Sequence, residues 1–381
     1  MRIGIDYTPA VRQAAGIGRL TRQLVGHLLR LDRRNSYHLF VAGPLKGSDL
    51  PWSGEPPANA RIHATRIPER ALTILWHRLR LNWPVERFTG PCDLFHSTDF
   101  VLPPVARARA LLTVHDLSFL RHPECAHPRL RAYLSSVVPR SLKRAHHVLA
   151  DSEATKRDLI DLLGVERDKI TVLYAGIEER FSPQADPAAE AQMRRALQLE
   201  GPYILSLGTI EPRKNYARLA RAYRELLALH GNDAPPLVIA GGKGWLYEGV
   251  FRSVEELKLG DRVRFLGFVE DQHLPALYRG ATLFVFPSLY EGFGFPPLEA
   301  MACGCPVVCS NRPSLPEVVG DAARLVDPCD ESHICQGMRI ALFDSQERER
   351  LVERGLARAA RFSWPAAAER LLAIYEGMGS A

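Results

Sequence analysis

Two glutamates eight positions apart carry the clearest chemical signal in this chain. Glu291 and Glu299 bracket a loop with two glycines and two prolines, and the apolar run 283–286 before this loop predicts a buried strand. Because proline is tolerated in the first turn of a helix, a helix should begin at the prolines. Carboxylates accept hydrogen bonds from hydroxyl groups, and the free N–H groups at a helix start bind anions. The segment therefore predicts a site for a ligand with both hydroxyls and phosphates, such as a nucleotide-sugar.

The backbone between the two glutamates should line the same site. We expect Glu291 on the loop after the strand and Glu299 in the first helical turn. Phe293, Gly294 and Phe295 come directly before the prolines, so N–H groups there should point at whatever lies between the carboxylates. Two glutamates at this spacing also occur by chance as solvated charges, but the strand, loop and helix context favours a binding site.

A second motif, residues 208–215, places two basic side chains beside the expected start of another helix. Arg213 and Lys214 come just before a helical pattern over Tyr216–Leu229, and Asn215 is a good N-cap residue for it. Cationic side chains next to the positive end of a helix suit a diphosphate. The motif therefore predicts a diphosphate site, with a solvated basic turn as the alternative.

The elements that must position these residues form two successive series of strands. The first half of the chain predicts strands at Arg2–Asp6, Tyr37–Ala42, Arg61–Ala64, Asp93–His96, Ala110–Val114, Val148–Ala150 and Ile170–Leu173. The second half predicts strands at Tyr203–Leu207, Leu237–Ala240, Arg262–Leu266, Leu283–Phe286, Pro306–Cys309 and Ala323–Val326. Helical patterns such as Arg19–Leu31 lie between the strands. This alternation predicts an α/β protein with two doubly wound, Rossmann-like parallel sheets that face a cleft.

A stretch rich in proline and alanine, residues 182–190, looks like the linker between the two series. We expect an N-terminal domain over 1–180, a C-terminal domain over 181–361 and a final amphipathic helix within 362–381. In doubly wound sheets ligands bind at the carboxyl ends of the strands. Both motifs described above follow such an end.

The segment around Glu291 resembles the E-x7-E signature of retaining glycosyltransferases of family 4, which adopt the GT-B fold. The match extends from Ser288-Leu289-Tyr290 to Ser314-Leu315-Pro316-Glu317, and the resemblance covers nearly the whole chain. It implies that Glu291 holds hydroxyls of the transferred sugar and Glu299 the ribose. It also implies that Arg213 and Lys214 stabilise the departing diphosphate, and that the last helix crosses back to the N-terminal domain.

One position departs from the family pattern. Many members have arginine directly after the glycine of the second motif, whereas this chain has Thr209 after Gly208. One phosphate contact must therefore come from Arg213 or be missing. The sequence shows no obvious carboxylate nucleophile, so the resemblance implies front-face attack, with the leaving phosphate taking the acceptor proton.

The N-terminal half contributes two further candidate groups. Gly16 and Gly18 lie in the loop 14–18 after the first strand, where glycines allow a backbone to approach a phosphate and a plain turn is the alternative. His115 and Asp116 end a predicted strand and should face the cleft. The resemblance implies that His115 contacts the donor sugar near the reacting centre and that Asp116 assists donor binding; a polar rim is the alternative.

Two loops of the second half are weaker candidates. Val269, after Phe268, falls where members of the resembled family pack the nucleobase. Residues 241–244, Gly-Gly-Lys-Gly, either support phosphates or simply turn the chain.

No metal or cofactor is expected. The 381 residues contain no Asp-x-Asp pair, and the seven cysteines lack the C-x2-C pairs and separated histidines of a zinc site. A metal-free mechanism fits this, because lysine, arginine and helix starts can neutralise a leaving diphosphate. We interpret the cysteines as small core residues in a reducing compartment.

The charge of the chain is uneven. Residues 1–180 hold 27 basic and 18 acidic residues, and residues 181–381 hold 22 and 25. A basic half favours an anionic partner, namely nucleic acid, acidic lipid or a phosphorylated acceptor. Segment 66–88 interleaves arginine with leucine and tryptophan, and Trp76 and Trp83 fall on one face if it is helical. The segment is thus a candidate for an anionic membrane surface, or an ordinary helix packed on the sheet. No nucleic-acid-binding module is evident.

Composition sets the remaining limits. Apolar residues make up 46% of the chain, no apolar stretch is long enough to span a membrane, and no signal peptide is evident, so the cytoplasm is the expected location. Residues 208–215 and 292–297 look most like those of bacterial mannosyltransferases of O-antigen and exopolysaccharide assembly. We therefore expect transfer of mannose from GDP-mannose to a glycan or lipid-linked glycan. The alternatives are a glucosyl or N-acetylglucosaminyl transferase that uses a UDP-sugar, and a GT-B epimerase.

Overall fold

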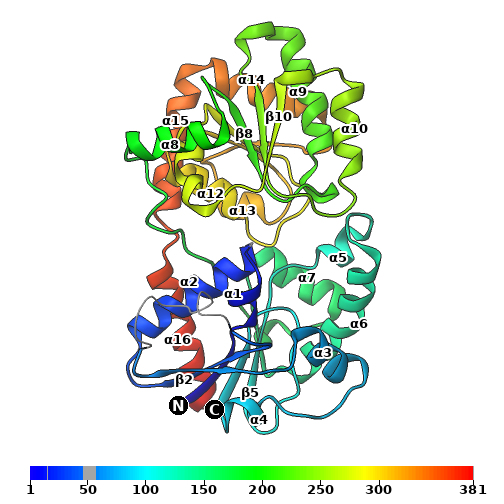
Figure 1. Ribbon diagram of the computed structural model, residues 1–381, viewed down its shortest axis with the longest axis vertical. Coiled ribbons are helices and arrows are strands. Elements are labelled where there is room, and N and C mark those ends of the chain that lie inside the picture. The colour runs from blue at the N-terminus through cyan, green and yellow to red at the C-terminus, as the bar shows by residue number, and fades with distance from the viewer. Residues whose placement is uncertain (15, 46–56, 381) are drawn as a thin grey trace. The chain divides into compact units, whose positions relative to one another are not determined.

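The computed structural model describes residues 1–14, 16–45 and 57–380. These residues form two compact units (Figure 1). The first consists of Met1–Leu120, Pro128–Gly176 and the chain from Ser363, and the second of Arg121–His127 and Ile177–Phe362. The boundary between the units thus lies at Gly176, four residues before the position expected from the linker.

The described part of the first unit contains a seven-stranded parallel sheet. Its strands are β1 (Arg2–Asp6), β2 (Ser36–Val41), β3 (Ala60–Ala64), β4 (Leu94–Ser97), β5 (Arg109–Val114), β6 (His147–Ala150) and β7 (Ile170–Val172). They lie in the order β3-β2-β1-β4-β5-β6-β7. The chain moves outward from β1 to β3 and then returns to the other side at β4, so the topological switch point lies between β1 and β4.

Helices cover this sheet. They are α1 (Thr8–Arg12), α2 (Gly16–Leu31), α3 (Glu69–Thr73), α4 (Glu86–Thr89), α5 (Ser118–Arg121), α6 (Pro128–Arg144), α7 (Glu153–Leu163) and α16 (Trp364–Ser380), with a π-helical turn at Ile74–Arg78 and a 3-10 turn at Arg167–Lys169. Helix α2 buries Leu20, Leu24 and Leu28 on one face, and α16 packs beside it (Figure 1). The Tyr375 hydroxyl of α16 lies 2.7 Å from Nδ1 of His96 in β4, so the end of the chain belongs to the core of the first unit.

The second unit repeats this design with six parallel strands in its described residues. They are β8 (Ile204–Leu207), β9 (Leu237–Ala240), β10 (Val263–Gly267), β11 (Leu283–Phe286), β12 (Val307–Ser310) and β13 (Arg324–Val326), in the order β10-β9-β8-β11-β12-β13. The switch point therefore lies between β8 and β11. Side chains of the central strands are fully buried, as the apolar runs predicted.

The helices of the second unit are α8 (Pro187–Leu197), α9 (Tyr216–His230), α10 (Glu248–Glu256), α11 (Leu274–Arg279), α12 (Phe295–Ala302), α13 (Leu315–Val319), α14 (Glu331–Phe343) and α15 (Ser345–Ala359). Single 3-10 turns occur at Pro123–Cys125, Pro212–Lys214, Gly231–Asp233, Gly260–Arg262 and Asp271–His273. The strands predicted from the sequence are all present, with ends displaced by at most one residue.

Three expected segments differ from the structure. The second half of the stretch 182–190 is helical, because Asp186 caps α8 by accepting from the N–H of Ala189 at 3.0 Å and Pro187 fits the first turn. Helix α2 begins at Gly16, so the glycines expected in a loop lie in its first turn; Ala15 is outside the described residues. Segment 66–88 is not one helix: α3 passes into the π-helical turn, and the chain then leaves helical geometry at Arg80, whose φ is 55°.

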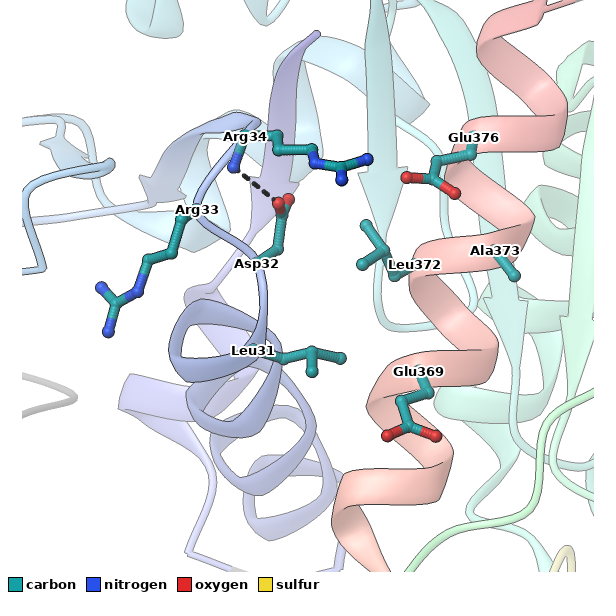
Figure 2. Close-up of a pocket in the computed structure, with 8 residues that line it drawn as sticks. All are labelled: Leu31, Asp32, Arg33, Arg34, Glu369, Leu372, Ala373 and Glu376. Carbon is teal, nitrogen blue, oxygen red and sulfur yellow. Dashed lines mark hydrogen bonds between the residues drawn. The ribbon is translucent and has the colours of Figure 1, made fainter.

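A cavity of about 390 Å³ lies between the end of α2 and the side of α16 (Figure 2). Its lining includes Asp32, Arg34, Glu369 and Glu376, and the Arg34 N–H donates to Asp32 at 2.8 Å. Asp32 is also held by Asn35 and Tyr37. These residues immediately precede β2, at the amino end of the sheet, whereas ligands of doubly wound sheets bind at the carboxyl ends. The cavity is therefore separate from the candidate site.

Candidate functional site

The loop after β8 is shaped by glycine. Gly208 has a φ of 152°, and a Cβ there would lie 3.2 Å from Cε of Lys214 and 3.2 Å from the Tyr216 hydroxyl. The stem of Lys214 thus passes over Gly208, and its Nζ lies 5.0 Å from the ring centre of Phe286 in β11. The absence of a side chain at Gly208 directs the Lys214 ammonium toward the neighbouring loop after β11.

The loop after β11 carries Glu291 and is held from two sides. The Glu291 N–H donates to Pro313 O at 3.2 Å, and its carbonyl accepts from the Ser314 N–H at 3.1 Å. The N–H of Leu289 donates to Arg213 O at 2.9 Å. These bonds connect the loop after β11 to the loops after β8 and β12 and fix the backbone from which the Glu291 side chain extends.

The two sequence motifs meet in one buried ion-pair network. Lys214 Nζ lies 2.5 Å from Glu291 Oε1, and Arg213 Nη1 lies 2.7 Å from Glu291 Oε2. Arg213 also donates to Tyr290 O at 2.8 Å, and its Nη2 lies 2.7 Å from Glu211 Oε1. Each carboxylate oxygen of Glu291 therefore faces one cation, and Arg213 binds two carboxylates, those of Glu291 and Glu211.

Electrostatics keep Glu291 ionised. Burial alone raises the pKa of this carboxyl, but the adjacent charges of Arg213 and Lys214 outweigh burial and bring its pKa to about 2. Glu291 is consequently a full negative charge at neutral pH.

Asn215 does not cap α9 with its side chain, contrary to the sequence prediction. Its backbone is left-handed, with a φ of 62°, and its amide instead donates to Pro287 O at 3.1 Å and Pro328 O at 2.7 Å. Asn215 thereby ties the loop after β11 to the residue two positions beyond β13. Its role is to hold the switch-point loops together, which the capping rule did not anticipate.

Glu299 lies in the second turn of α12 rather than in the first, because the helix begins at Phe295. It is only 1% exposed, and its Oε2 accepts from the Tyr278 hydroxyl of α11 at 2.9 Å. The two glutamates of the motif thus have different partners: Glu291 faces cations and Glu299 faces a tyrosine. The contact of Glu299 with a ribose stays a prediction.

The residues between the glutamates form a packed turn. Gly294 has a φ of 122°, and a Cβ there would lie 2.7 Å from Leu315. The Phe293 ring packs against those of Phe295 and Phe362, with centres 5.2 and 5.7 Å away, and Phe293 O accepts from Ser314 Oγ at 2.7 Å. The aromatic rings anchor the turn, and only its backbone remains suited to a ligand.

The two weaker candidate loops of this unit follow β9 and β10. Gly241 approaches the loop after β8 so closely that a Cβ would lie 2.0 Å from Gly208 O. This packing explains the first glycine of 241–244 without a phosphate. At the end of β10, Val269 is buried at 6% exposure, whereas the neighbouring Phe268 is 66% exposed. If a base stacks here, the accessible ring of Phe268 is the better platform than Val269.

His115 in the first unit has both ring nitrogens engaged. Nδ1 lies 2.8 Å from Asp151 Oδ2 at the end of β6, and Nε2 lies 2.8 Å from Thr98 O at the end of β4. Burial lowers the pKa of His115, but the charges of Asp151 and Asp99 outweigh it and raise the pKa to about 9. As an imidazolium it donates to both partners, so a contact with a sugar, which stays a prediction, requires Nε2–H to leave Thr98.

Two of the three remaining candidates of the first unit have structural explanations. Asp116 accepts from the Ser118 N–H at 2.8 Å and so caps the start of α5. A Cβ on Gly18 would lie 1.8 Å from Gln13 O, so this glycine is needed where α2 meets the end of α1. Gly16 is exposed, with open space around its Cα. Phosphate binding by these glycines stays a prediction.

Comparison with known proteins identifies the family. Residues 189–358 match glycosyl transferases group 1, and residues 14–181 match glycosyltransferase family 4. Over 374 residues the chain is 37% identical to the O-antigen chain mannosyltransferase B of Escherichia coli, covering 96% of each protein. The chain belongs to the family 4 glycosyltransferases. Over 220 residues it is also 30% identical to the O-antigen chain mannosyltransferase RfbU of Salmonella typhimurium, covering 58% of the chain and 57% of RfbU.

Solved structures agree with the fold. Sucrose-phosphate synthase of Thermosynechococcus elongatus superposes with a TM-score of 0.77 at 20% identity, covering 100% of this chain and 99% of that one. WaaG, a glycosyltransferase involved in lipopolysaccharide biosynthesis, gives a TM-score of 0.73 at 15% identity, covering 98% of this chain and 99% of its own. The chain is thus a glycosyltransferase with the GT-B fold.

Three residues that the sequence alone did not single out contact the candidate site residues. Glu211, Tyr278 and Asp151 contact Arg213, Glu299 and His115 respectively. Glu211 could have been found, because it lies two positions before Arg213 in the same motif. Tyr278 and Asp151 lie in other elements, 21 and 36 residues from their partners, and no spacing rule connects them.

Residues 1–14, 16–45 and 57–380 contain no group of three or more histidine, cysteine, aspartate and glutamate side chains able to hold a metal ion. No helix within these ranges is long and apolar enough to cross a bilayer.

Proposed function

We propose that this glycosyltransferase transfers mannose, with retention of configuration, from GDP-mannose to a glycan or lipid-linked glycan acceptor in polysaccharide assembly. The observation that carries the proposal is the network at the second switch point, where two cations and the Glu291 carboxylate converge. The two O-antigen mannosyltransferases described above support mannose as the donor sugar.

The chemistry follows from the charges. Transfer leaves a nucleoside diphosphate whose charge grows as its bond to the sugar breaks, and Lys214 and Arg213 offer N–H donors at that place. Glu291 offers a charged acceptor for sugar hydroxyls, and buried Glu299 an acceptor for the ribose. With these cations available, the proposed mechanism requires neither a metal nor another cofactor.

A direct transfer assay tests the proposal. The purified enzyme is incubated with GDP-mannose, UDP-glucose or UDP-N-acetylglucosamine and a lipid-linked glycan, with and without EDTA, and products are followed by mass spectrometry. We expect glycan mass to increase by one hexose only with GDP-mannose, equally with EDTA, and the new bond to keep the donor's configuration by NMR. Transfer from a UDP-sugar would show that the donor is not GDP-mannose. Epimerised sugar without transfer would show that the enzyme is an epimerase.

We further propose that the enzyme works at the inner face of the cytoplasmic membrane, bound reversibly to anionic lipid. The tryptophans expected to insert there are only partly exposed and contact other parts of the same segment: Trp76 Nε1 donates to Trp83 O at 2.8 Å, and both rings pack against Phe88. The turn instead exposes Leu79, at 61%, and Leu81, at 46%.

Basic side chains surround these leucines. Arg78 and Arg80 beside them are exposed. The neighbouring helix α6 holds five basic and no acidic residues and contacts the turn through His77 and Tyr133, whose ring centres are 6.4 Å apart. Apolar side chains amid arginines fit an anionic bilayer, where each basic residue contributes about 1 kcal/mol.

Vesicle co-sedimentation tests this part separately. Changing Leu79 and Leu81 to serine and Arg78 and Arg80 to alanine should release the enzyme from anionic vesicles while nucleotide-sugar binding is kept. The matched control is Leu229→Ser, which changes a leucine of the second unit that is 65% exposed and should leave sedimentation unchanged. Equal, negligible binding of the wild type to anionic and neutral vesicles would favour a soluble acceptor.

A further inference from the structure

The groups proposed to hold the diphosphate are already occupied by the protein's own carboxylates. Lys214 and Arg213 Nη1 both bind Glu291, and Arg213 Nη2 binds Glu211. A diphosphate needs the same N–H donors and carries the same sign of charge as Glu291. The two anions cannot share these cations without close repulsion, since like charges a few ångströms apart in a buried site interact strongly.

We propose that Glu291 and the donor's diphosphate compete for Lys214 and Arg213, and that Glu211 is a positioning residue that keeps Arg213 in place during the exchange. This inference rests on the proposed donor class. In the empty site Glu291 holds both cations; when the diphosphate arrives, it takes the cations and releases the carboxylate to the sugar hydroxyls. After transfer Glu291 recaptures the cations, which favours departure of the nucleoside diphosphate.

The backbone allows this exchange without rearranging the loop. Glu291 is bonded through its N–H to Pro313 and through its carbonyl to Ser314, so the main chain stays fixed. Its side chain retains 11% exposure, so rotation about side-chain bonds is enough to move the carboxylate between cations and sugar. The ionised state of Glu291 makes it a charged competitor throughout the neutral range.

Burial and the neighbouring backbone hydrogen bonds fix the position of Glu211. Its side chain is only 3% exposed, and Arg213 is its ion-pair partner. The preceding residue, Ile210, is paired on both sides with the glycine loop: its N–H donates to Gly242 O at 2.9 Å and its carbonyl accepts from the Gly244 N–H at 3.0 Å. When Nη1 of Arg213 leaves Glu291, its Nη2 therefore remains anchored.

The competition gives a result that a simple loss of a binding residue does not. Removing the charge with Glu291→Gln should weaken turnover yet tighten the binding of a nucleoside diphosphate, because the competing anion is gone. A charge-assisted hydrogen bond is worth enough to change an affinity by about tenfold or more. Calorimetric titration of GDP and of UDP into the wild type and the variant measures this change directly.

The control is Glu299→Gln, which removes the charge of a buried carboxylate that accepts from the Tyr278 hydroxyl at 2.9 Å. It should not tighten diphosphate binding. If Glu291→Gln fails to fold by circular dichroism, Glu291→Ala serves instead, with the same expected gain. Wild type that binds GDP or UDP, together with an unchanged or weaker Glu291 variant, overturns the exchange alone. Wild type that binds neither nucleotide overturns the proposed donor class and the exchange with it.

A double-mutant cycle tests Glu211. Glu211→Gln should weaken binding of the same nucleotide about tenfold, and this loss should vanish when Arg213 is already alanine, because Glu211 acts only through that side chain. A loss of equal size in both backgrounds would show that Glu211 merely supports the loop and would reject its positioning role.

Discussion

The two units share one topology and differ in the charges at their switch points. In the second, the carboxyl ends of β8 and β11 bring Arg213 and Lys214 to Glu291. In the first, the equivalent strands β1 and β4 lead to Asp6 and Asp99, while His115 after β5 pairs with Asp151 after β6 and has the Asp99 carboxylate close enough to raise its pKa. A doubly wound sheet therefore specifies where chemistry occurs, whereas the residues at the strand ends specify which chemistry.

The comparison also shows that net charge of a half-chain says little about its site. Residues 1–180 carry a net +9, yet the first switch point is rich in carboxylates. Burial there raises the pKa of Asp6 to about 6, against the lowering effect of its hydrogen bond with Thr8. The basic residues lie instead on surface elements such as α6. We therefore propose that the anionic partner predicted from composition binds that surface rather than the strand ends.

The largest effect that separates the two switch points should come from Lys214. Lys214→Ala removes a cation where the diphosphate charge develops, and losing one such group typically costs about 100–1,000-fold in turnover. The measurement is the rate of transfer at saturating GDP-mannose. His115→Gln, in the first unit, is the companion variant and should lose less. A smaller loss of turnover for Lys214→Ala than for His115→Gln would show that His115 contributes more to catalysis than Lys214.

The second effect is a pH dependence of stability that comes from His115 in the first unit. The pKa of His115 is raised to about 9 from its usual value of 6.5, so the folded state binds more protons than the unfolded state between these values. Its stabilisation is complete below pH 6.5 and is lost as the pH rises through 9, on the order of 3 kcal/mol in all. Histidines with lowered pKa, such as His96 and His77, contribute their changes below pH 6.5.

Thermal unfolding at half-unit steps from pH 6 to 9.5 measures this dependence. We expect the melting temperature of the wild type to fall across this window and that of His115→Gln to be lower and flatter. Parallel curves for the two proteins would mean that His115 is neutral in the folded state and that the Asp151 contact is an ordinary hydrogen bond.

The sequence predicted the fold closely because both sheets are built from short apolar runs bounded by turn residues. The central parallel strands are buried on both faces, so their hydrophobicity is local information that one segment displays by itself. Two of the segments that were predicted wrongly depend on features other than hydrophobicity, namely a helix cap and a change of backbone conformation. Asp186 and Pro187 started a helix inside an expected linker, and the segment after Arg78 left helical geometry.

The candidate site was predictable only in part, because contacts between residues far apart in the sequence do not appear in a local pattern. Residue types and spacing indicated Glu291, Arg213 and Lys214, yet nothing in the sequence said that they bind one another, because they lie 77 and 78 residues apart. The inward orientation of Trp76 likewise depends on Phe40 and Phe88, which belong to other elements. Partners across elements come from topology, which a spacing rule does not contain.

A smaller effect tests whether the glycines of the first unit serve the ligand or the fold. Gly18→Ala places a Cβ 1.8 Å from a backbone oxygen of Gln13 and should destabilise the protein by about 1–3 kcal/mol, as overpacking does. Gly16→Ala meets open space and should leave stability nearly unchanged. Melting temperature and donor affinity are measured for both. Equal loss of donor affinity in both variants, without loss of stability, would show a phosphate-binding loop instead.

The smallest expected effect concerns the nucleobase. Phe268, next to the predicted Val269, is the more accessible stacking surface. Phe268 exposes its ring at the end of β10, whereas Val269 is buried. Stacking of a base on an aromatic ring is worth about 1–3 kcal/mol, so Phe268→Ala should raise the KM for the donor by about tenfold and leave kcat nearly unchanged. Phe268→Tyr keeps a stacking face and should retain the wild-type KM. Val269→Ala, a core truncation, should lower the melting temperature more than it changes KM. If Val269→Ala raises KM and Phe268→Ala does not, the base contacts the buried side chain, and the second switch point binds its ligand more deeply than the exposed ring indicates.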